Sequence, residues 1–209
     1  MAMRSHPFEI LQEKLDSTIL GEIRLMEIEK GAFLYQPPQR ITPIFEIVAG
    51  VIKIGSYSPE GEEVCYDILK PGDFFGNLQF LNGQFSEFSK ALCPVRLRVY
   101  EHSLFMKLTR EVTEFGEWFN YQLVSRWCRA EDRLFAVRSM GAVEKVRRIL
   151  PHFQERVVDS QGKNVQLLKL CTFQDIADLT GLSRQTVSKV LKPKAEASTS
   201  PFSRKRARV

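Results

Sequence analysis

The stretch TFQDIADLTGLSRQTVSKVLK, residues 172–192, decides the fold of this chain. Its apolar side chains recur at helical spacing in two groups, which predicts one helix over residues 173–179 and a second over residues 183–192. Between them Gly181 can adopt a positive φ angle that ends the first helix sharply, and Ser183 offers the side chain preferred at a helix N-cap. Two short helices joined by a tight turn around one apolar seam are typical of a helix-turn-helix.

The second of these helices is expected to carry a polar outward face. Val187, Val190 and Leu191 would pack in the seam. The opposite face is polar and basic, and it comprises Arg184, Gln185, Ser188, Lys189 and Lys192. Arginine pairs with guanine, glutamine with adenine and serine with either base, whereas lysine suits phosphate oxygens. The face predicts contact with duplex DNA; the alternative is a solvated basic face on an ordinary amphipathic helix pair.

The charge of the chain is distributed unevenly. Residues 139–209 hold 14 lysines and arginines against 6 acidic residues, a net charge of +8. Residues 1–138 hold 16 basic and 19 acidic residues, a net charge of −3. Positive charge concentrated around the predicted helix-turn-helix is the electrostatic signature of a region that binds a polyanion.

Composition narrows the class of protein. The 209 residues are 44% hydrophobic and 26% charged, which is typical of a globular protein of one or two domains. Because the chain has no apolar run of about 18 residues and no secretory leader, we expect a cytoplasmic protein without a membrane anchor. The four cysteines and three histidines are too scattered for a metal site. No nucleophile–base pair or phosphate-cradling glycine loop occurs, so we expect neither a bound metal nor catalysis.

Residues 30–100 are expected to form β structure. Short runs rich in Val, Ile, Phe and Tyr, such as GVIKIGSY (50–57) and EEVCYDIL (62–69), are separated by turn sequences. The SPEGEE sequence (58–63) between these two runs predicts a hairpin turn. Evenly spaced short strands with such turns predict a sandwich or a barrel-like roll.

Residues 103–138 are expected to form one long helix, because the segment lacks proline and holds one glycine, Gly116. Its apolar side chains recur every three or four residues. A small β domain cannot cover a helix of about nine turns. The stripe therefore predicts pairing with the same helix of a second chain, as in a coiled coil, and the alternative is a helix buried within its own chain. The predicted dimer interface comprises Phe115, Phe119, Leu123, Trp127, Ala130 and Leu134.

The rest of the C-terminal region gives weaker local signals. GAVEKVRRILPHF (141–153) predicts a helix that ends at Pro151, and VQLLKL (165–170) predicts a short strand before the helix-turn-helix. Pro193 is expected to stop the last helix. The residues that follow, with their Pro, Ser and terminal basic run, are expected to form a poorly ordered tail.

A β-roll, a long helix and a C-terminal helix-turn-helix, in this order, resemble the Crp/Fnr family of bacterial transcription regulators. The resemblance spans nearly the whole chain. It rests on VAGVIKI (48–54), LKPGDFFG (69–76), DIADLTGLSRQTVSKVL (175–191) and SRKRARV (203–209).

The resemblance implies an α+β fold in three parts. A jelly-roll-like β-roll of the cyclic nucleotide-binding type is expected over residues 1–110, a dimerisation helix over 111–138 and a winged helix-turn-helix DNA-binding domain over 139–209. In the family a two-stranded wing follows the recognition helix. Here SRKRARV resembles the first wing strand alone, so the wing is expected to be incomplete.

The resemblance also implies partners and contact residues. A member of the family is a homodimer that binds a near-palindromic site in double-stranded DNA, with RNA polymerase as a further partner. By position, Arg184, Gln185 and Ser188 match the base-reading residues, and Thr172 and Gln174 match phosphate contacts. The predicted DNA-contacting set is Thr172, Gln174, Ser183, Arg184, Gln185, Ser188, Lys189 and Lys192.

The sequence departs from the cyclic-nucleotide binders of that family inside the roll. Those proteins have Gly-Glu-Leu where this chain has Gly76-Asn77-Leu78, and an arginine element where it has QFSEFSKA (84–91). A phosphate buried without a cation is costly, so we expect no response to cyclic AMP unless Lys90, Arg96 or Arg98 replaces that arginine. The candidate effector pocket comprises Phe75, Gly76, Asn77, Leu78, Phe85 and Ser86.

The candidate effector pocket has two interpretations. It is either filled by the chain's own phenylalanines or open to an apolar effector, and no cofactor is predicted. Taken together, the sequence predicts a homodimeric, sequence-specific DNA-binding transcription regulator. The alternative is a small-molecule sensor that acts through protein–protein contacts and has a weakened DNA-binding domain.

Overall fold

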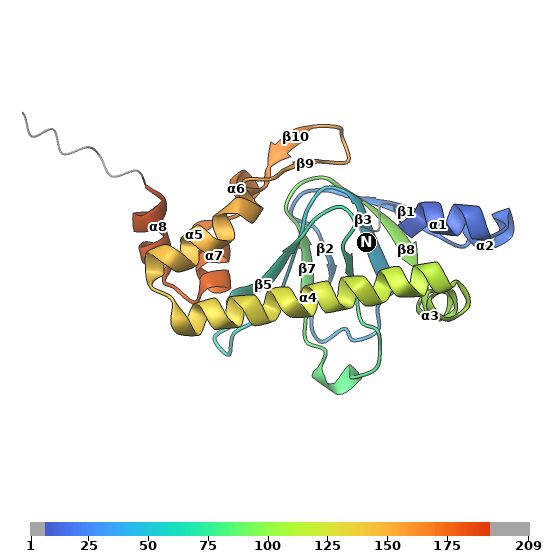
Figure 1. The fold of residues 1–209 in the computed structure, drawn as a ribbon, viewed down its shortest axis with the longest axis horizontal. Helices are drawn as coiled ribbons and strands as arrows, with labels where there is room; N and C mark the ends of the chain where they lie inside the picture. The colour runs from blue at the N-terminus through green and yellow to red at the C-terminus, as the bar shows by residue number, and fades with distance from the viewer. Residues whose placement is uncertain (1–6, 193–209) are drawn as a thin grey trace, which may run out of the picture.

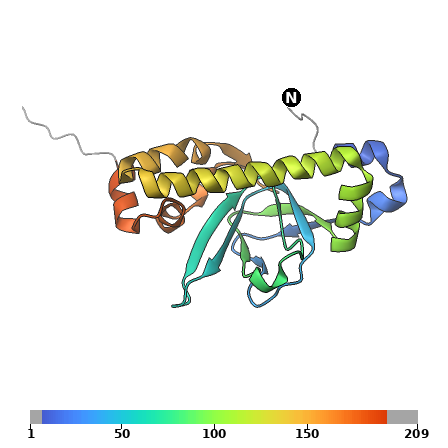
Figure 2. The same ribbon diagram turned by 60° about the horizontal axis from the view of Figure 1, so that its bottom comes forward.

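The structure is a computed structural model, and it describes residues 7–192. The predictions made for Pro193, the wing strand SRKRARV and the basic tail lie outside the described residues. Helix α4 (Thr113–Ser139) runs along the length of the molecule. A β-roll lies against it, with the helices of residues 7–21 and 102–111 at one end and those of residues 142–191 at the other (Figures 1 and 2). The predicted order of β-roll, long helix and C-terminal helices is confirmed.

The roll consists of two four-stranded antiparallel sheets, in the orders β1-β8-β3-β6 and β2-β7-β4-β5. The prediction of β structure over residues 30–100 is confirmed, and the first strand begins earlier, at Arg24. The elements are β1 (Arg24–Ile28), β2 (Phe33–Tyr35), β3 (Ile44–Ala49), β4 (Ile52–Tyr57), β5 (Glu63–Leu69), β6 (Phe74–Phe75), β7 (Phe88–Ala91) and β8 (Val95–Tyr100), with the 3-10 turn η1 (Asn82–Gln84) before β7.

Strand alternation builds the core between the two sheets. On β8, Val95, Leu97 and Val99 point inward and are at most 1% exposed, whereas Arg96 and Arg98 between them are half-buried. The other sheet contributes Ile52 and Ile54, and aromatic rings fill the space between. Full burial of each aliphatic side chain stabilises the fold by roughly 1.5–3 kcal/mol.

The SPEGEE hairpin between β4 and β5 forms as predicted. The Ser58 N–H donates to the Glu62 carbonyl at 2.9 Å, and Gly61 has a φ of +85°, in the region that favours glycine. The hairpin also contains a β-bulge that the sequence does not reveal. Ile54 pairs with Asp67 and Gly55 with Cys65, so Tyr66 is the extra residue.

The prediction of one helix over residues 103–138 is wrong, because the segment forms two helices. Helix α3 (His102–Glu111) ends at Val112, whose extended backbone (φ −106°, ψ 95°) turns the chain into α4. The two helices touch at Gly116, where a Cβ atom would lie 2.4 Å from the Thr109 carbonyl oxygen. The apolar spacing runs through both helices in the sequence because α3 and α4 bury their apolar side chains in the same hydrophobic cluster.

That cluster joins α3 and α4 to the N-terminal helices α1 (Pro7–Lys14) and α2 (Ser17–Gly21). Leu11 of α1 and Phe105 of α3 are fully buried in it. Phe74 of the roll packs edge-on against Trp118 of α4, with ring centroids 4.4 Å apart. The roll is therefore fixed to the first turns of α4 by aromatic packing.

The C-terminal region contains α5 (Ala142–Phe153), the hairpin of β9 (Arg156–Val158) and β10 (Asn164–Gln166), and three helices: α6 (Leu167–Leu170), α7 (Phe173–Thr180) and α8 (Arg184–Leu191). Two local predictions are wrong. Helix α5 continues through Pro151, because a proline in the last turn removes only one backbone hydrogen bond. The segment predicted as a strand over 165–170 is a strand only to Gln166 and then becomes α6.

None of the helices within residues 7–192 is long and apolar enough to cross a lipid bilayer.

The contact at Gly116 generates a stability prediction. A Gly116→Ala variant should lower the free energy of unfolding by about 1–3 kcal/mol, because α3 and α4 must move apart to admit the methyl group. Chemical denaturation followed by circular dichroism measures it. Gly21→Ala is the matched control: it lies in a helix with open space around it and should be neutral or slightly stabilising. Equal stabilities of the two variants would contradict the close packing of α3 on α4.

Candidate nucleic-acid interface

Helix α7 begins with a capping box. The Thr172 hydroxyl accepts a hydrogen bond from the Asp175 N–H at 3.1 Å, and the Asp175 carboxylate accepts one from the Thr172 N–H at 2.7 Å. This reciprocal pair satisfies two backbone donors that a helix N-terminus leaves free. The sequence expectation placed Thr172 at a phosphate contact. The structure leaves Thr172 and Gln174 exposed on the first turn, although the Gln174 amide also donates to Asp178 at 2.7 Å.

The turn between α7 and α8 depends on Gly181, as predicted. Gly181 has left-handed backbone angles (φ 61°, ψ 36°), and the Leu182 N–H donates to the Ala177 carbonyl at 3.0 Å. This is the left-handed C-terminal cap that only glycine adopts without strain. Gly181 also lies against α4, because an added Cβ atom would be 2.9 Å from a methyl carbon of Val137.

Helix α8 begins at the predicted N-cap and packs on the predicted seam. The Ser183 hydroxyl accepts a hydrogen bond from the Thr186 N–H at 3.2 Å. Val187 is fully buried against Ile176 and Ala177 of α7 and Val146 of α5. Val190 and Leu191 pack on the edge of this cluster. Burial of this single apolar face sets the rotation of α8 about its axis, and so decides which side chains point outward.

The outward face of α8 gathers the predicted base-reading residues. Arg184, Gln185, Lys189 and Lys192 are exposed and Ser188 is half-buried. Together with Ser183 and Phe173, they line one open concave surface. Six of the eight predicted DNA-contacting residues are therefore brought together on this surface. Thr172 and Gln174 lie beside it on α7, and the predicted grouping of polar side chains on one side of α8 is confirmed.

The predicted effector residues do not line a single pocket. Phe75 and Phe85 lie in the core of the roll, whereas Leu78 packs toward the α1–α4 cluster. The Ser86 hydroxyl lies at the surface beside the Ser56 hydroxyl, at 3.3 Å. Phe75, Gly76 and Leu78 border a cavity of only about 50 Å³ between the roll and α4.

Asn77, which stands where the cyclic-nucleotide binders of the family have a glutamate, holds its own loop together. It is buried, and its backbone N–H donates to the Thr42 hydroxyl at 2.8 Å. Its side-chain amide donates to the Arg40 carbonyl at 2.5 Å and accepts from the Gln79 N–H at 2.8 Å. These bonds to two neighbouring segments use the polar atoms that would otherwise face a ligand.

The interior of the roll is occupied by its own aromatic side chains and one carboxylate. Tyr35 packs against Phe45, Phe75 and Phe85, with ring centroids 5.8 to 6.2 Å away. The Tyr35 hydroxyl donates to Glu87 at 2.5 Å. Burial raises the pKa of both Tyr35 and Glu87, and Arg126 of α4 approaches Glu87 at 4.0 Å. Of the two interpretations of this region, the self-filled roll fits the packing.

The three cations considered as substitutes for the missing arginine are engaged elsewhere. Lys90 pairs with Glu63 at 2.7 Å, and Arg96 pairs with Glu27 at 2.7 Å. Arg98 pairs with the buried Glu46 at 2.8 Å and stacks over the ring of Phe8.

The predicted dimer stripe on α4 divides into two parts. Phe115 is fully buried within its own chain and is not available to a partner, which corrects the prediction for this residue. Phe119 packs against the same cluster but is only half-buried, so its place in a dimer interface stays a prediction. Leu123, Trp127, Ala130 and Leu134 remain exposed. Sequence spacing alone missed other exposed apolar residues on this helix, namely Tyr121, Val124 and Phe135.

Comparison with known proteins agrees with this architecture. Residues 25–111 match the cyclic nucleotide-binding domain family. The chain is 22% identical over 189 residues to the CRP-like cAMP-activated global transcriptional regulator of Mycobacterium tuberculosis, a match that covers 90% of this chain and 84% of that protein. It is 24% identical over 179 residues to the nitrogen fixation regulation protein FixK of Bradyrhizobium diazoefficiens, covering 84% and 75% of the two chains.

A solved structure shows the same fold across most of the chain. A CooA mutant from Carboxydothermus hydrogenoformans superimposes with a TM-score of 0.67 at 21% identity, covering 91% of this chain and 84% of that one. Residues 25–111 are thus similar to a cyclic nucleotide-binding domain, and over most of its length the chain is similar to regulators of the Crp/Fnr type.

Proposed function

We propose that this relative of the Crp/Fnr regulators is a sequence-specific DNA-binding transcription regulator that acts as a homodimer. The observation that carries the proposal is the outward face of α8. Helix α8 is the second helix of a helix-turn-helix, and its orientation is set by the buried apolar seam, the Ser183 N-cap and the turn at Gly181. The side chains that consequently point away from the protein are Arg184, Gln185, Ser188 and Lys189. The named relatives are transcriptional regulators, which supports the same conclusion.

The chemistry of the face assigns different roles to its residues. Arg184 opens α8, where side chains of a recognition helix reach base edges in the major groove, and a guanidinium can bond both guanine O6 and N7. Lys189 and Lys192 lie farther along α8 and suit phosphate oxygens, which position a protein on DNA without reading sequence. Arg184 would therefore supply specificity and the lysines affinity.

The exposed side of α4 supports a dimer. Val124, Trp127 and Leu134 are each more than half exposed, and with Glu131 they follow the alternating three- and four-residue spacing of a coiled-coil seam. The opposite side of α4 is occupied by the roll. A two-fold dimer through this seam would present two α8 helices, as recognition of a near-palindromic site requires. Contact with RNA polymerase stays a prediction.

Cyclic AMP is not the effector in this proposal. Glu87 occupies the interior of the roll, and Asn77 is committed to its own loop. A cyclic phosphate entering there would meet the Glu87 carboxylate, and Arg126 of α4, which approaches that carboxylate at 4.0 Å, already faces its negative charge. The sensor function considered as the alternative has less support, because aromatic side chains pack between the two sheets and the cavity bordered by Phe75, Gly76 and Leu78 measures about 50 Å³.

Substitutions on α8 test the DNA-binding role. Arg184→Ala should weaken binding by about 1–3 kcal/mol and relax preference at one base pair per half-site. Lys189→Ala should weaken binding to all DNA sequences to a similar extent. It should also reduce the slope of log affinity against log salt concentration by about 1, the value for one lost phosphate contact. Affinity measured against a randomised site library at several salt concentrations separates the two. If both variants lose affinity uniformly, Arg184 does not read bases.

A charged seam tests the dimer. Val124→Glu combined with Leu134→Glu should yield a monomer of 24.1 kDa in sedimentation, because four carboxylates would have to be desolvated in the interface. The matched control is Leu25→Glu with Ile41→Glu, which introduces the same charges at exposed apolar positions of the roll and should remain dimeric. A seam variant that sediments with the wild-type protein would rule out this interface.

Thermal unfolding tests the response to cyclic AMP. We expect an unchanged melting temperature at millimolar cyclic AMP, whereas a ligand at a hundred times its Kd would add about 2.7 kcal/mol of stability. The Mycobacterium tuberculosis relative, named as cAMP-activated, is the positive control. A clear upward shift in this protein would show that the roll binds the nucleotide despite Glu87.

A further inference from the structure

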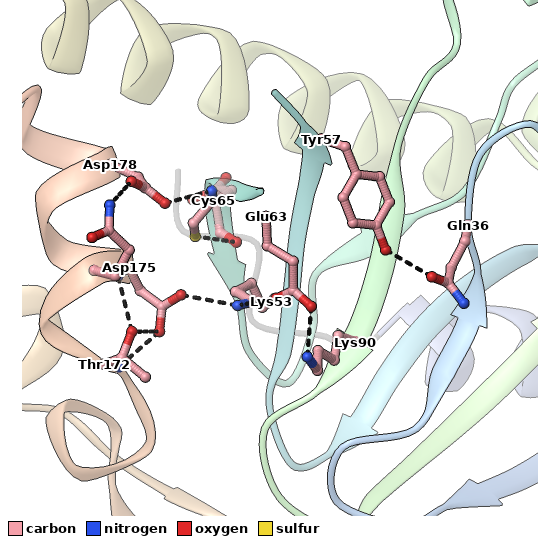
Figure 3. Close-up of polar contacts among 11 residues, drawn as sticks. Gln36, Lys53, Tyr57, Glu63, Cys65, Lys90, Thr172, Asp175 and Asp178 are labelled. Atoms are coloured by element: carbon pink, nitrogen blue, oxygen red, sulfur yellow. Dashed lines mark hydrogen bonds and ion pairs between the residues drawn. The ribbon is translucent and has the colours of Figure 1, made fainter. Parts of the chain in front are cut away.

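Helix α7 docks on the outer face of the β4–β5 hairpin through a buried ion pair. The Lys53 ammonium of β4 lies 3.0 Å from the Asp175 carboxylate of α7 and 2.9 Å from the Glu63 carboxylate of β5 (Figure 3). The Lys53 side chain is 9% exposed and that of Asp175 is 3% exposed. We call the contact between Lys53 and Asp175 the docking pair.

A second polar contact lies beside the docking pair. The backbone N–H of Cys65 donates to the Asp178 carboxylate at 2.8 Å, as Figure 3 shows. The β-bulge at Tyr66 shifts the register of β5 at this point. A bulge disrupts the ladder locally, and here a side chain of α7 binds the N–H of the neighbouring residue. The Asp178 carboxylate of α7 thus accepts a hydrogen bond from β5 that a neighbouring strand would otherwise accept.

The charges of the docking pair are stabilised by the groups around them. Burial of Lys53 works against its charged form, but hydrogen bonds and the charges of Glu63 and Asp175 outweigh it, so the pKa of Lys53 is raised. Asp175 is almost fully buried and bonded to Thr172 on its other oxygen. If Lys53 lost its charge, Asp175 would be left as an uncompensated buried carboxylate, which a protein avoids by moving the group to water.

Docking favours contact between DNA and the α7–α8 helices in two ways. It leaves the outward face of α8 uncovered, because the roll contacts the acidic side of α7. It also places Asp175 and Asp178 against the roll, next to a cation and a backbone donor. In an undocked domain both carboxylates would stand in water beside Thr172 and Gln174, where they would repel DNA phosphates.

The docking pair is adjacent in sequence to the interior of the roll. Ile52 and Ile54 flank Lys53 on β4 and are fully buried in the interior core, while Lys53 points to the opposite face. Lys53 is thus held in place by a strand that is packed on both sides.

We propose that Lys53 is a positioning residue for DNA binding: through Asp175 it holds the α7–α8 pair in the DNA-competent orientation without touching DNA. This inference rests on the proposed function, because it assigns the control of the same DNA-binding surface. It makes the affinity for DNA depend on a side chain of the roll.

Lys53→Met is the test, and Lys90→Met is its matched control. Both lysines bind Glu63, at 2.9 and 2.7 Å, but only Lys53 reaches α7. Using full-length protein and a site selected by the wild type, we expect Lys53→Met to weaken DNA binding about tenfold, as it would if about a tenth of the molecules remained docked. Lys90→Met should stay within about twofold of wild type.

Amide hydrogen exchange at Cys65 measures docking without DNA. We expect exchange of this N–H to be about tenfold faster in Lys53→Met than in Lys90→Met, because its acceptor on α7 moves away. Asp178→Ala, which removes that acceptor from the half-buried side of α7, should also accelerate it. This variant gives the exchange rate of the Cys65 N–H without its acceptor, which is the upper reference for Lys53→Met.

A double variant separates positioning from general damage. Asp175→Asn in the Lys53→Met background removes the uncompensated charge, and the asparagine oxygen can still accept from the Thr172 N–H. It should restore DNA affinity to within about threefold of wild type.

Three results would count against specific claims. The positioning role is overturned if Lys53→Met matches Lys90→Met in DNA affinity, even with faster exchange at Cys65. The docking pair itself is overturned if Cys65 exchange is unchanged in Lys53→Met. If the wild type selects no DNA site, the proposed function fails, whereas the exchange experiment still decides whether Lys53 docks α7.

Discussion

The arrangement of the whole chain depends on helix α4, which buries apolar side chains on one side and leaves others exposed on the opposite side. Its 27 residues extend over about 40 Å. One side of the helix contacts the rest of the chain near its start, in its second half and near its end. Phe115 and Trp118 lie in the aromatic cluster at its start, Arg133 bonds to Asp67 of the roll, and Val137 meets Gly181 near its end. Because the roll and the C-terminal helices are both placed against this side, the opposite side is left to water or to a partner.

The contacts between the roll and the C-terminal region combine apolar packing with charges. Val51 and Ile68 of the roll share a buried cluster with Phe153 and Leu179. Around it lie ion pairs of Lys70 with Glu155 and of Lys53 with Asp175. Apolar contact supplies most of the attraction but tolerates sliding, whereas a buried ion pair is satisfied in one geometry. We infer that the charges select the orientation of α7 and that the apolar cluster stabilises it.

Local signals in the sequence were sufficient to predict the outward face of α8. The turn at Gly181, the N-cap at Ser183 and the rotation of α8 set by Val187 all depend on residues that are close together in sequence. They could therefore be predicted from short-range chemistry. Contacts between distant residues could not be read in this way. The end of α3 depends on Gly116 meeting Thr109 across a corner, and Lys53 is 122 residues from Asp175. A helical stripe likewise does not tell whether Phe115 packs within its own chain or against another.

The candidate effector region shows why resemblance to a family predicts the fold of a chain more safely than the ligand that it binds. Replacement of a glutamate by Asn77 changes the side chain by one methylene and one charge, yet Asn77 now bonds Arg40 and Gln79. Tyr35 and Glu87 complete a self-contained interior, and a packed interior leaves strand β4 little freedom to shift. Under the docking proposal, a β4 strand fixed from within holds Lys53 against Asp175 in the absence of any ligand. A roll of this kind acts as a permanent platform for α7, and regulation through it would then require a partner able to separate the docking pair.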